Sequence, residues 1–266
     1  MDTATTHQTT RDYLRPLRYL WRVPLLLIHA VLAILLVGLV LSWNQHRVMH
    51  GGREPLPHRM IRWWSTGLLR IFGLRSVRVG QPLADPVLFV ANHTSWIDIV
   101  LLYSQRAVCF VAKAEISRWP LVGWLAKGGG TIFHRRGSNH SLSAVMQVMV
   151  ERLREGRSVA VFPEGGTSHD GELKVFHARI FQAALDAEAA VQPVALRFAR
   201  AGRREHGAGF REHESFFANF LRLLGNPPMD AEVHFLAPVP ASPDARRKMA
   251  ELSRERIAAA LEDRAA

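Results

Sequence analysis

Two side chains separated by four residues, His93 and Asp98, could form an acid–base pair. Both lie in the run Asn92-His93-Thr94-Ser95-Trp96-Ile97-Asp98, which follows an apolar stretch at 87–91. A histidine at a strand end, with a carboxylate in the first turn of the next helix, can act as a general base with an orienting partner. Two simpler interpretations compete, because Ser95 and Asp98 also have capping-box spacing and a single loop histidine is usually solvated. The pair alone therefore does not establish catalysis.

A second run, from Pro163 to Ser168, could bind an anion. In it Glu164 is followed by Gly165 and Gly166, then by Thr167 and Ser168. The glycines allow backbone N–H groups to approach an anion, and the two hydroxyls add donors. No Gly-Lys-Ser/Thr follows, so this is not a nucleotide phosphate loop. Taken alone, Pro-Glu-Gly-Gly is more often a turn than a site.

Arg135 and Arg136 follow a further apolar run at 131–133. Two arginines in a loop are by default an exposed pair. Their position favours a binding role, because ligands of α/β proteins usually bind where the strands end, at the carboxyl edge of the sheet. His93, Arg135 and Glu164 each follow a predicted strand, so we expect them at one common edge.

The elements that must position these residues follow from the apolar pattern. Beyond residue 80, short apolar runs alternate with helical patterns, which predicts an α/β fold with a mainly parallel central sheet flanked by helices. Strands are expected at 87–91, 107–112, 131–133, 158–162, 191–198 and 231–236. Helices are expected at 141–155, 177–188 and 243–264, and residues 200–230 are expected to form an irregular excursion.

The N-terminal part of the chain differs in composition. Residues 24–41 carry no formal charge, and as a helix they would span ~27 Å, close to the hydrocarbon thickness of a bilayer. Arginines flank this stretch on both sides, each worth about 1 kcal/mol near an anionic surface. The run at 61–72 places two tryptophans beside arginines, as in a helix lying among lipid head groups. We therefore expect a basic, membrane-associated segment at 1–75, a helical pair that dips into or lies on one leaflet with both flanks on the same side, and an α/β domain at 76–266.

The overall composition narrows the function classes. The chain has 266 residues, 48% of them hydrophobic, and a formal net charge of +11 from 34 basic and 23 acidic residues. A disordered chain is excluded, and the basic excess, mostly arginine, predicts an anionic partner. A single cysteine, Cys109, rules out an internal disulfide and a Cys-built zinc site. No His-Glu-x-x-His or comparable spacing occurs, so we expect no metal.

Four ordered blocks resemble those of the glycerolipid acyltransferases, the 1-acylglycerol-3-phosphate acyltransferase family. They are Asn92-His93-x4-Asp98, Ile132-Phe133-His134-Arg135, Phe162-Pro163-Glu164-Gly165 and Val191-Gln192-Pro193-Val194. The resemblance covers roughly residues 85–200, and the ordered set is more specific than any single block. It implies that His93 is the catalytic base and Asp98 its orienting partner. It also implies that Arg135, Glu164 and Gly165 belong to the acceptor site and that Pro193 lies near the acyl donor.

One departure from the family pattern concerns the acceptor. The third block commonly continues Gly-Thr-Arg-Ser, whereas here it reads Gly165-Gly166-Thr167-Ser168. A missing guanidinium removes one possible phosphate clamp. Arg135 or Arg136 could compensate, or the acceptor could be a lyso-lipid with an amino-acid head, as in ornithine-lipid synthesis, because the Thr-Ser ending resembles that bacterial branch.

The resemblance implies acyl transfer from acyl-CoA or acyl-carrier protein to the free hydroxyl of a lyso-lipid, with 1-acyl-sn-glycerol-3-phosphate as the first candidate and lyso-ornithine lipid as the alternative. It implies no cofactor, no nucleic acid, and a place at the bacterial inner membrane with the site on the cytoplasmic side. A non-enzymatic membrane-binding protein remains open. A serine hydrolase using Ser95 or Ser168 is less favoured, because no Gly-x-Ser-x-Gly elbow occurs.

Overall fold

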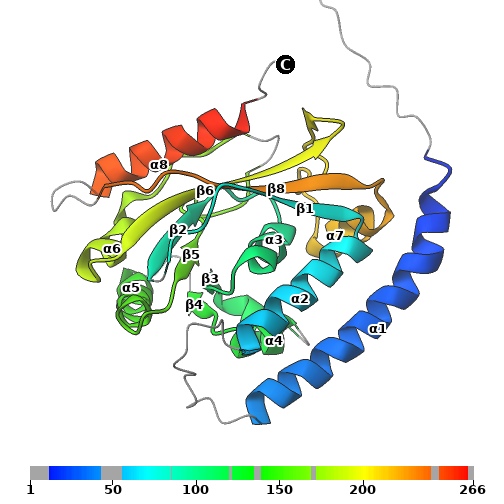
Figure 1. Cartoon of the computed structure of the whole chain (residues 1–266), viewed down its shortest axis with the longest axis horizontal. Coiled ribbons are helices and arrows are strands. Elements are labelled where there is room, and N and C mark those ends of the chain that lie inside the picture. The colour runs from blue at the N-terminus through cyan, green and yellow to red at the C-terminus, as the bar shows by residue number, and fades with distance from the viewer. Residues whose placement is uncertain are drawn as a thin grey trace, which may run out of the picture.

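A mixed β-sheet forms the centre of the molecule (Figure 1). The computed structural model describes residues 12–42, 56–84, 86–119, 122–134, 139–168, 172–240 and 246–262. Within these residues eight strands form one sheet in the order β1-β8-β6-β2-β5-β3-β4, and β7 pairs with β6 beside this path. The strands are β1 (Leu74–Val79), β2 (Val87–Ala91), β3 (Cys109–Lys113), β4 (Ile132–His134), β5 (Val159–Val161), β6 (Ala190–Arg200), β7 (Arg203–Arg204) and β8 (Met229–Phe235).

The prediction of a mainly parallel sheet is confirmed. Strands β6, β2, β5, β3 and β4 run parallel, and in this register Val90 lies opposite both Val161 and Pro193. Strand β8 runs antiparallel to β6, and β1 runs parallel to β8. The carboxyl ends of β2, β5, β3 and β4 therefore meet at one edge of the sheet.

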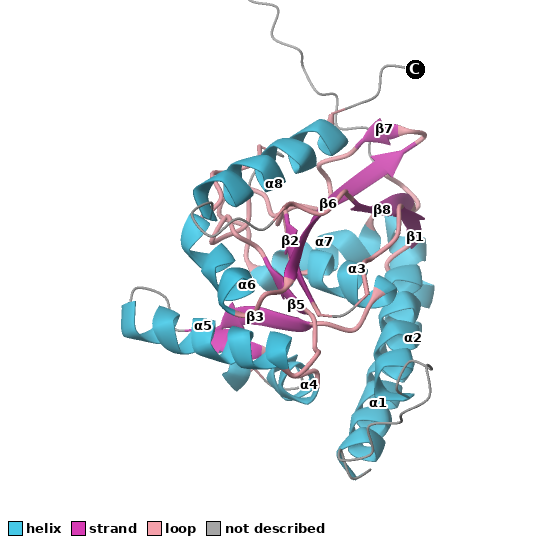
Figure 2. Ribbon diagram, turned by 60° about the vertical axis from the view of Figure 1, so that its left-hand side comes forward, coloured by secondary structure: helices cyan, strands magenta, loops and turns pink. Residues whose placement is uncertain are grey.

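Helices cover both faces of the sheet, as Figure 2 shows. On one face Phe89 and Ala91 pack with residues of α2 (Leu56–Ile71), α3 (Ile97–Gln105) and α7 (Phe216–Gly225). On the other face Leu88 and Val90 pack with α5 (Asn139–Arg154), α6 (Gln182–Asp186) and α8 (Arg246–Leu261). Because successive strand residues point to opposite faces, a strand with helices on both sides is apolar throughout. Further helical segments are η1 (Ala114–Arg118), α4 (Val122–Gly128) and η2 (Ala178–Phe181).

The first helix, α1 (Arg15–Ser42), runs along α2 and α7 at the outside of the body (Figure 1). It is long and apolar enough to cross a membrane by length and composition: Arg15–Leu35 has a mean hydropathy of 1.5, and 17% of that window is buried. Its outward side chains are apolar; Leu20 and Leu27 are 73% and 63% exposed. An apolar surface of this kind is typical of contact with lipid or another protein.

Two arginines of α1 face the protein, which corrects one expectation. Arg22 is buried, and its Nη1 donates to the backbone carbonyls of Leu224 and Asn226 at 2.8 Å each. Arg18 Nη1 donates to the carbonyl of Gly225 at 2.9 Å. These carbonyls end α7 and have no intrahelical partner, and cations at a helix C-terminus are favourable. Arg18 and Arg22 thus fasten α1 to α7 rather than facing lipid head groups.

The expectation of an irregular excursion at 200–230 was wrong over Phe216–Gly225, where the chain forms helix α7. Ser215 is its N-cap, and the Ser215 hydroxyl accepts a hydrogen bond from the Ala218 N–H at 3.2 Å. The helix places Leu223 and Leu224 in the core. The sequence boundary at residue 75 falls inside β1, and α2 packs against α3, so the N-terminal segment shares its packing with the α/β body.

The close contact between α1 and the body can be tested at Gly73. This residue has a φ of +74°, and a Cβ there would overlap the guanidinium of the buried Arg22. Gly202 is a matched control, since its φ is +78° and nothing lies within 4 Å of an added Cβ. Gly202→Ala should lower the free energy of unfolding by about 1–2 kcal/mol, the backbone cost alone. Gly73→Ala should cost ~1–3 kcal/mol more because the Arg22 hydrogen bonds must shift.

Thermal unfolding midpoints of both variants in the same detergent, followed by circular dichroism, measure this difference. Equal midpoints would contradict the packing of Arg22 against Gly73.

Candidate functional site

His93 lies in the turn that follows β2, at the edge where the parallel strands end. The preceding residue anchors this turn to β6: Asn92 Nδ2 donates to the Leu196 carbonyl at 2.9 Å, and the Leu196 N–H donates to Asn92 Oδ1 at 2.8 Å. His93 Nδ1 lies 3.0 Å from Asp98 Oδ2. The spacing in the sequence therefore brings the two side chains together.

Asp98 is fully buried in the first turn of α3. Its Oδ2 accepts hydrogen bonds from the backbone N–H groups of Thr94 at 2.6 Å and Ser95 at 2.9 Å, and the Thr94 hydroxyl lies 3.2 Å from Oδ1. Since Oδ2 is an acceptor in these contacts, the hydrogen between it and His93 belongs to Nδ1. The neutral ring then carries a free electron pair on Nε2, the arrangement that a general base needs.

The capping-box interpretation is only partly met. Asp98 does satisfy backbone N–H groups at the start of α3, but the Ser95 hydroxyl is buried without a hydrogen-bond partner. The reciprocal bond of a capping box would join that hydroxyl to the Asp98 N–H, which instead donates to the Ser95 carbonyl at 3.2 Å. One carboxylate thus both caps the turn and holds the imidazole.

The imidazole of His93 is fixed on its face as well as its edge. It stacks on Phe162 with ring centroids 3.9 Å apart and planes 11° apart, and Phe162 in turn stacks on Phe110. The His93 side chain is 16% exposed. Among the described residues only Asp98 hydrogen-bonds the ring, so Nε2 is available to a substrate.

The Glu164 side chain holds the turn by accepting two backbone hydrogen bonds. Its Oε1 accepts the His93 N–H at 2.8 Å and its Oε2 accepts the Lys174 N–H at 3.0 Å. Burial raises the pKa of this carboxyl, while the hydrogen bonds from Lys174 and His93 oppose that rise. Both oxygens already have partners, so the side chain positions the His93 backbone whatever else it contacts.

The remaining residues of the third block surround the same turn. The Ser168 N–H and hydroxyl both donate to the His93 carbonyl, at 2.7 and 3.1 Å. Lys174 Nζ donates to the Thr167 carbonyl at 2.6 Å. Gly165 is exposed with a φ of +70°, which favours glycine, and Gly166 is half-buried.

The other predicted site residues lie at different distances from this turn. Pro193 is buried in β6 opposite Val90, and its carbonyl accepts the Leu236 N–H at 3.0 Å. Arg135 and Arg136 lie outside the described residues. They follow His134, the last residue of β4, which pairs in parallel with β3. Among the described residues, no three His, Cys, Asp or Glu side chains group in a way that could hold a metal ion.

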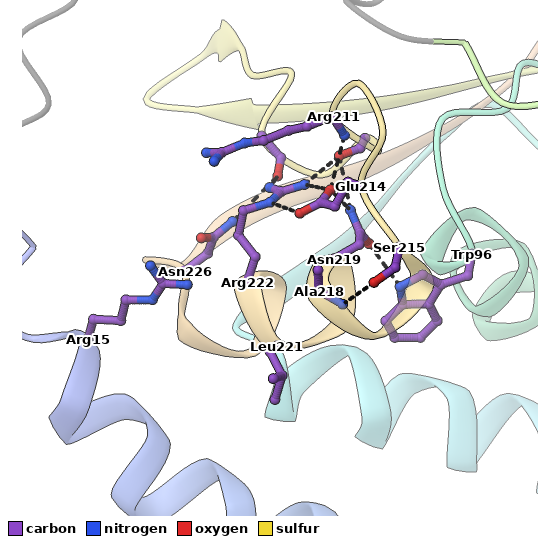
Figure 3. Close-up of polar contacts among 12 residues, drawn as sticks. Arg15, Trp96, Arg211, Glu214, Ser215, Ala218, Asn219, Leu221, Arg222 and Asn226 are labelled. Carbon is purple, nitrogen blue, oxygen red and sulfur yellow. Dashed lines mark hydrogen bonds and ion pairs between the residues drawn. The ribbon is translucent and has the colours of Figure 1, made fainter.

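The sequence analysis missed the part of the chain that holds the turn at 92–98 from the other side. The Phe210 N–H donates to the Thr94 carbonyl at 3.1 Å. Trp96 Nε1 donates to Asn219 Oδ1 at 3.0 Å, and Asn219 Nδ2 donates to Glu214 Oε2 at 3.0 Å, as Figure 3 shows. Phe210, Glu214 and Asn219 are more than 100 positions downstream of His93, and no motif marks them. The only local signal is the helical apolar pattern after Ser215.

An ion pair stabilises the segment at 209–222, which supports the turn. Arg222 and Glu214 are buried and joined by two hydrogen bonds of 2.7 Å each (Figure 3). Arg222 Nη2 also donates to the Gly209 carbonyl at 2.6 Å. The hydrogen bond from Arg222 lowers the pKa of Glu214 from 4.5 to about 2, with further hydrogen bonds from the Arg211 N–H and Asn219. A paired, hydrogen-bonded buried charge of this kind fixes the segment that carries it.

Comparisons with known proteins agree on one family. The family model described as Acyltransferase matches residues 52–197. The chain is 36% identical over 234 residues to the lyso-ornithine lipid O-acyltransferase of Pseudomonas aeruginosa, covering 87% of this chain and 90% of that protein. It is 34% identical over 167 residues to the 1-acyl-sn-glycerol-3-phosphate acyltransferase of Neisseria meningitidis, covering 62% of this chain and 65% of that protein.

A solved structure has the same fold. The crystal structure of the 1-acyl-sn-glycerophosphate acyltransferase PlsC from Thermotoga maritima superposes with a TM-score of 0.62. The match covers 91% of this chain and 97% of that chain, at 20% sequence identity. At this identity the likeness shows the arrangement of helices and strands.

The pKa of Glu214 predicts how stability depends on pH. Because its folded-state pKa of about 2 lies below the ordinary value of 4.5, its carboxylate stabilises the folded protein fully above pH 4.5. That contribution is lost as the pH falls toward 2. Glu214→Gln should lower the thermal midpoint most at neutral pH, and its difference from the wild type should shrink steadily below pH 4.5. Glu212→Gln, whose side chain is 86% exposed, should track the wild type. If the difference in thermal midpoint between Glu214→Gln and the wild type did not change with pH, the role of this ion pair would be refuted.

Proposed function

This chain belongs to the acyltransferase family, and we propose that His93 is the general base with which it acylates the free hydroxyl of a lyso-lipid. The resemblance carried by the four sequence blocks is confirmed by the family model over residues 52–197 and by the relatives. The observation that carries the proposal is the His93–Asp98 pair, with Nδ1 held at 3.0 Å by a buried carboxylate.

The reaction follows from that geometry. Nε2 of His93 takes the proton of the acceptor hydroxyl while the oxygen attacks the thioester carbonyl of acyl-CoA or acyl-carrier protein. The C–S bond then breaks, the thiolate leaves, and the imidazolium returns the proton to sulfur. Asp98 stabilises the imidazolium and keeps the ring in one tautomer. The stack on Phe162 keeps the ring from turning about its own bonds. No acyl-enzyme and no cofactor are needed, since the thioester is a co-substrate.

The geometry disfavours a serine hydrolase at this turn. The Ser168 hydroxyl donates to the His93 carbonyl, and the Ser95 hydroxyl is buried. Neither hydroxyl is hydrogen-bonded to the imidazole, as an activated nucleophile would be. Transfer to an external hydroxyl needs no such nucleophile.

For the acceptor we favour lyso-ornithine lipid. The relative with that activity matches 87% of this chain at 36% identity, whereas the Neisseria relative matches 62%. Thr167 stands where the family commonly has arginine, so a phosphate clamp is absent at this position. The second candidate, 1-acyl-sn-glycerol-3-phosphate, is favoured by the sequence that directly follows β4, which contains Arg135 and Arg136. In either case Gly165, Gly166 and Thr167 would lie along the acceptor and Pro193 toward the donor.

We place the protein at a membrane, with lipids as its partners. The support is α1, whose outward residues are apolar and whose arginines bind α7. Acyl-CoA and acyl-carrier protein are cytoplasmic, so the site would face the cytoplasm at the bacterial inner membrane. The acyl chain of the acceptor can then stay in the bilayer while its hydroxyl reaches His93.

The base assignment predicts the effect of His93→Ala. Loss of general base catalysis should lower kcat about 10²–10⁴-fold, measured as labelled acyl transfer to lyso-lipid in mixed micelles. His213→Ala is the matched control, because that histidine is 92% exposed and should leave kcat unchanged. His213→Ala should keep the wild-type thermal midpoint. His93→Ala should lower it, because this change removes one hydrogen-bond donor to the buried Asp98 carboxylate, so circular dichroism at the assay temperature must show that the variant is folded. A His93→Ala protein that retains most of its acyl transfer would overturn the assignment.

The acceptor assignment predicts substrate preference. With one acyl-CoA donor, lyso-ornithine lipid should be used with a kcat/KM about tenfold or more above that of 1-acyl-sn-glycerol-3-phosphate, because a phosphate lacking a charged hydrogen bond loses about 1.5–3 kcal/mol. Thr167→Arg should narrow this gap by improving use of the phosphate acceptor. Mass spectrometry of the products from a lyso-lipid panel measures both. A wild-type preference for the phosphate acceptor would reverse the assignment and leave acyl transfer intact.

A further inference from the structure

A cavity of about 300 Å³ opens beside the catalytic turn. It is lined by Thr94 and Ser168, by residues 196–198 of β6, by residues 204–207 and 209–212, and by Arg222 of α7. Thr94 directly follows His93, and Ser168 hydrogen-bonds the His93 carbonyl. The cavity therefore borders the turn that carries the residue proposed as the base.

The cavity is lined by side chains of both charges. Arg204 and Arg211 bring positive charge, and Glu205 and Glu212 bring negative charge. Several of these groups already have charged partners: Arg197 pairs with Glu232, Arg222 with Glu214, and Arg200 Nη1 lies 3.5 Å from Glu205 Oε1. A carboxylate has two oxygens and can accept a further charged donor. In Figure 3 the Arg211 backbone N–H bonds Glu214, while the Arg211 side chain extends away from that pair.

The wall of the cavity is held in place before any ligand binds. Arg222 Nη2 fixes the Gly209 carbonyl at 2.6 Å, and the Phe210 N–H fixes the Thr94 carbonyl at 3.1 Å. The Glu205 N–H donates to the Phe198 carbonyl at 2.8 Å. Because the backbone is already ordered, a ligand does not have to supply the free energy of ordering it.

These observations identify the kind of group that fits. A phosphomonoester is recognised by cations and repelled by carboxylates, whereas an amino-acid head group carries a carboxylate and an ammonium together. An ornithine linked to lipid through one amine keeps one charge of each sign. We propose that this cavity binds the zwitterionic head group of the acceptor, with Arg204 and Arg211 facing its carboxylate and Glu205 facing its ammonium. This inference rests on the proposed function and names the part of the chain that would select the acceptor.

The first test uses variants that remove one charge at a time. Arg211→Gln and Glu205→Gln should each raise KM for lyso-ornithine lipid about tenfold or more, with kcat and the KM for acyl-CoA near wild type. Arg203→Gln is the matched control, because Arg203 is exposed on β7 and does not line the cavity. Thermal midpoints show whether each variant is folded.

The second test uses acceptors that lack one charge, because a merely structural role would not affect their discrimination. The wild type should disfavour both the carboxyl methyl ester and the N-acetylated amine of lyso-ornithine lipid. Arg211→Gln should lose most of its discrimination against the ester only. Glu205→Gln should lose most of its discrimination against the acetylated amine only.

The outcomes separate the two levels of the proposal. An active wild type whose variants keep wild-type discrimination against both analogues overturns the cavity assignment alone. A rise in KM for 1-acyl-sn-glycerol-3-phosphate in Arg211→Gln, together with a fall in Glu205→Gln, would show a phosphate site and also overturn it. A wild type that acylates no lyso-lipid overturns the proposed function, and this inference falls with it.

Discussion

The buried carboxylate of Asp98 is the constraint on which the site depends. A fully buried charge is tolerated only when hydrogen bonds replace its lost hydration. Here the donors are the N–H groups of Thr94 and Ser95, the Thr94 hydroxyl and the His93 ring. Satisfying the carboxylate therefore requires one conformation of the turn and one orientation of the imidazole. The hydrogen bonds that satisfy Asp98 in α3 thus also hold the His93 ring in position.

The turn is supported from three directions by chain segments far apart in sequence. Asn92 binds it to β6, and Glu164 and Ser168 bind it to the turn after β5. The segment before α7 binds it through Phe210 and Asn219. Since Arg18 and Arg22 attach α7 to α1, hydrogen bonds connect the apolar outer helix, through α7, to the turn at 92–98. Helix α1 is thus structurally continuous with the candidate site.

Local patterns in the sequence predicted the parts of the fold that depend on local chemistry. The apolar runs at 87–91 and 158–162 became β2 and β5 because both faces of these strands are buried, and the parallel arrangement brought His93 and Glu164 together. The sequence could not show that β8 runs antiparallel to β6, since that direction is set by packing. It also could not show the roles of Arg22 and Arg222. Buried arginines have the same local pattern as exposed ones, and only tertiary structure brings backbone carbonyls to them.

Exposed apolar residues lie on several helices near the site. Besides α1, exposed apolar residues occur on α7, where Phe217 is 66% exposed, and at the start of α4, where Val122 is 39% exposed. Phe216 of α7 contacts both Trp119 and Trp96, and Trp96 lies in the turn at 92–98. Helix α1 contacts both α4 and α7. The aromatic contacts of Phe216 and Trp96 thus connect the exposed apolar residues of α7 to the turn at 92–98. Under the proposed function, a lipid lying against these helices would lift only its polar end from the membrane to meet His93, which would avoid the hydrophobic cost of extracting its acyl chain, ~0.8 kcal/mol per CH₂.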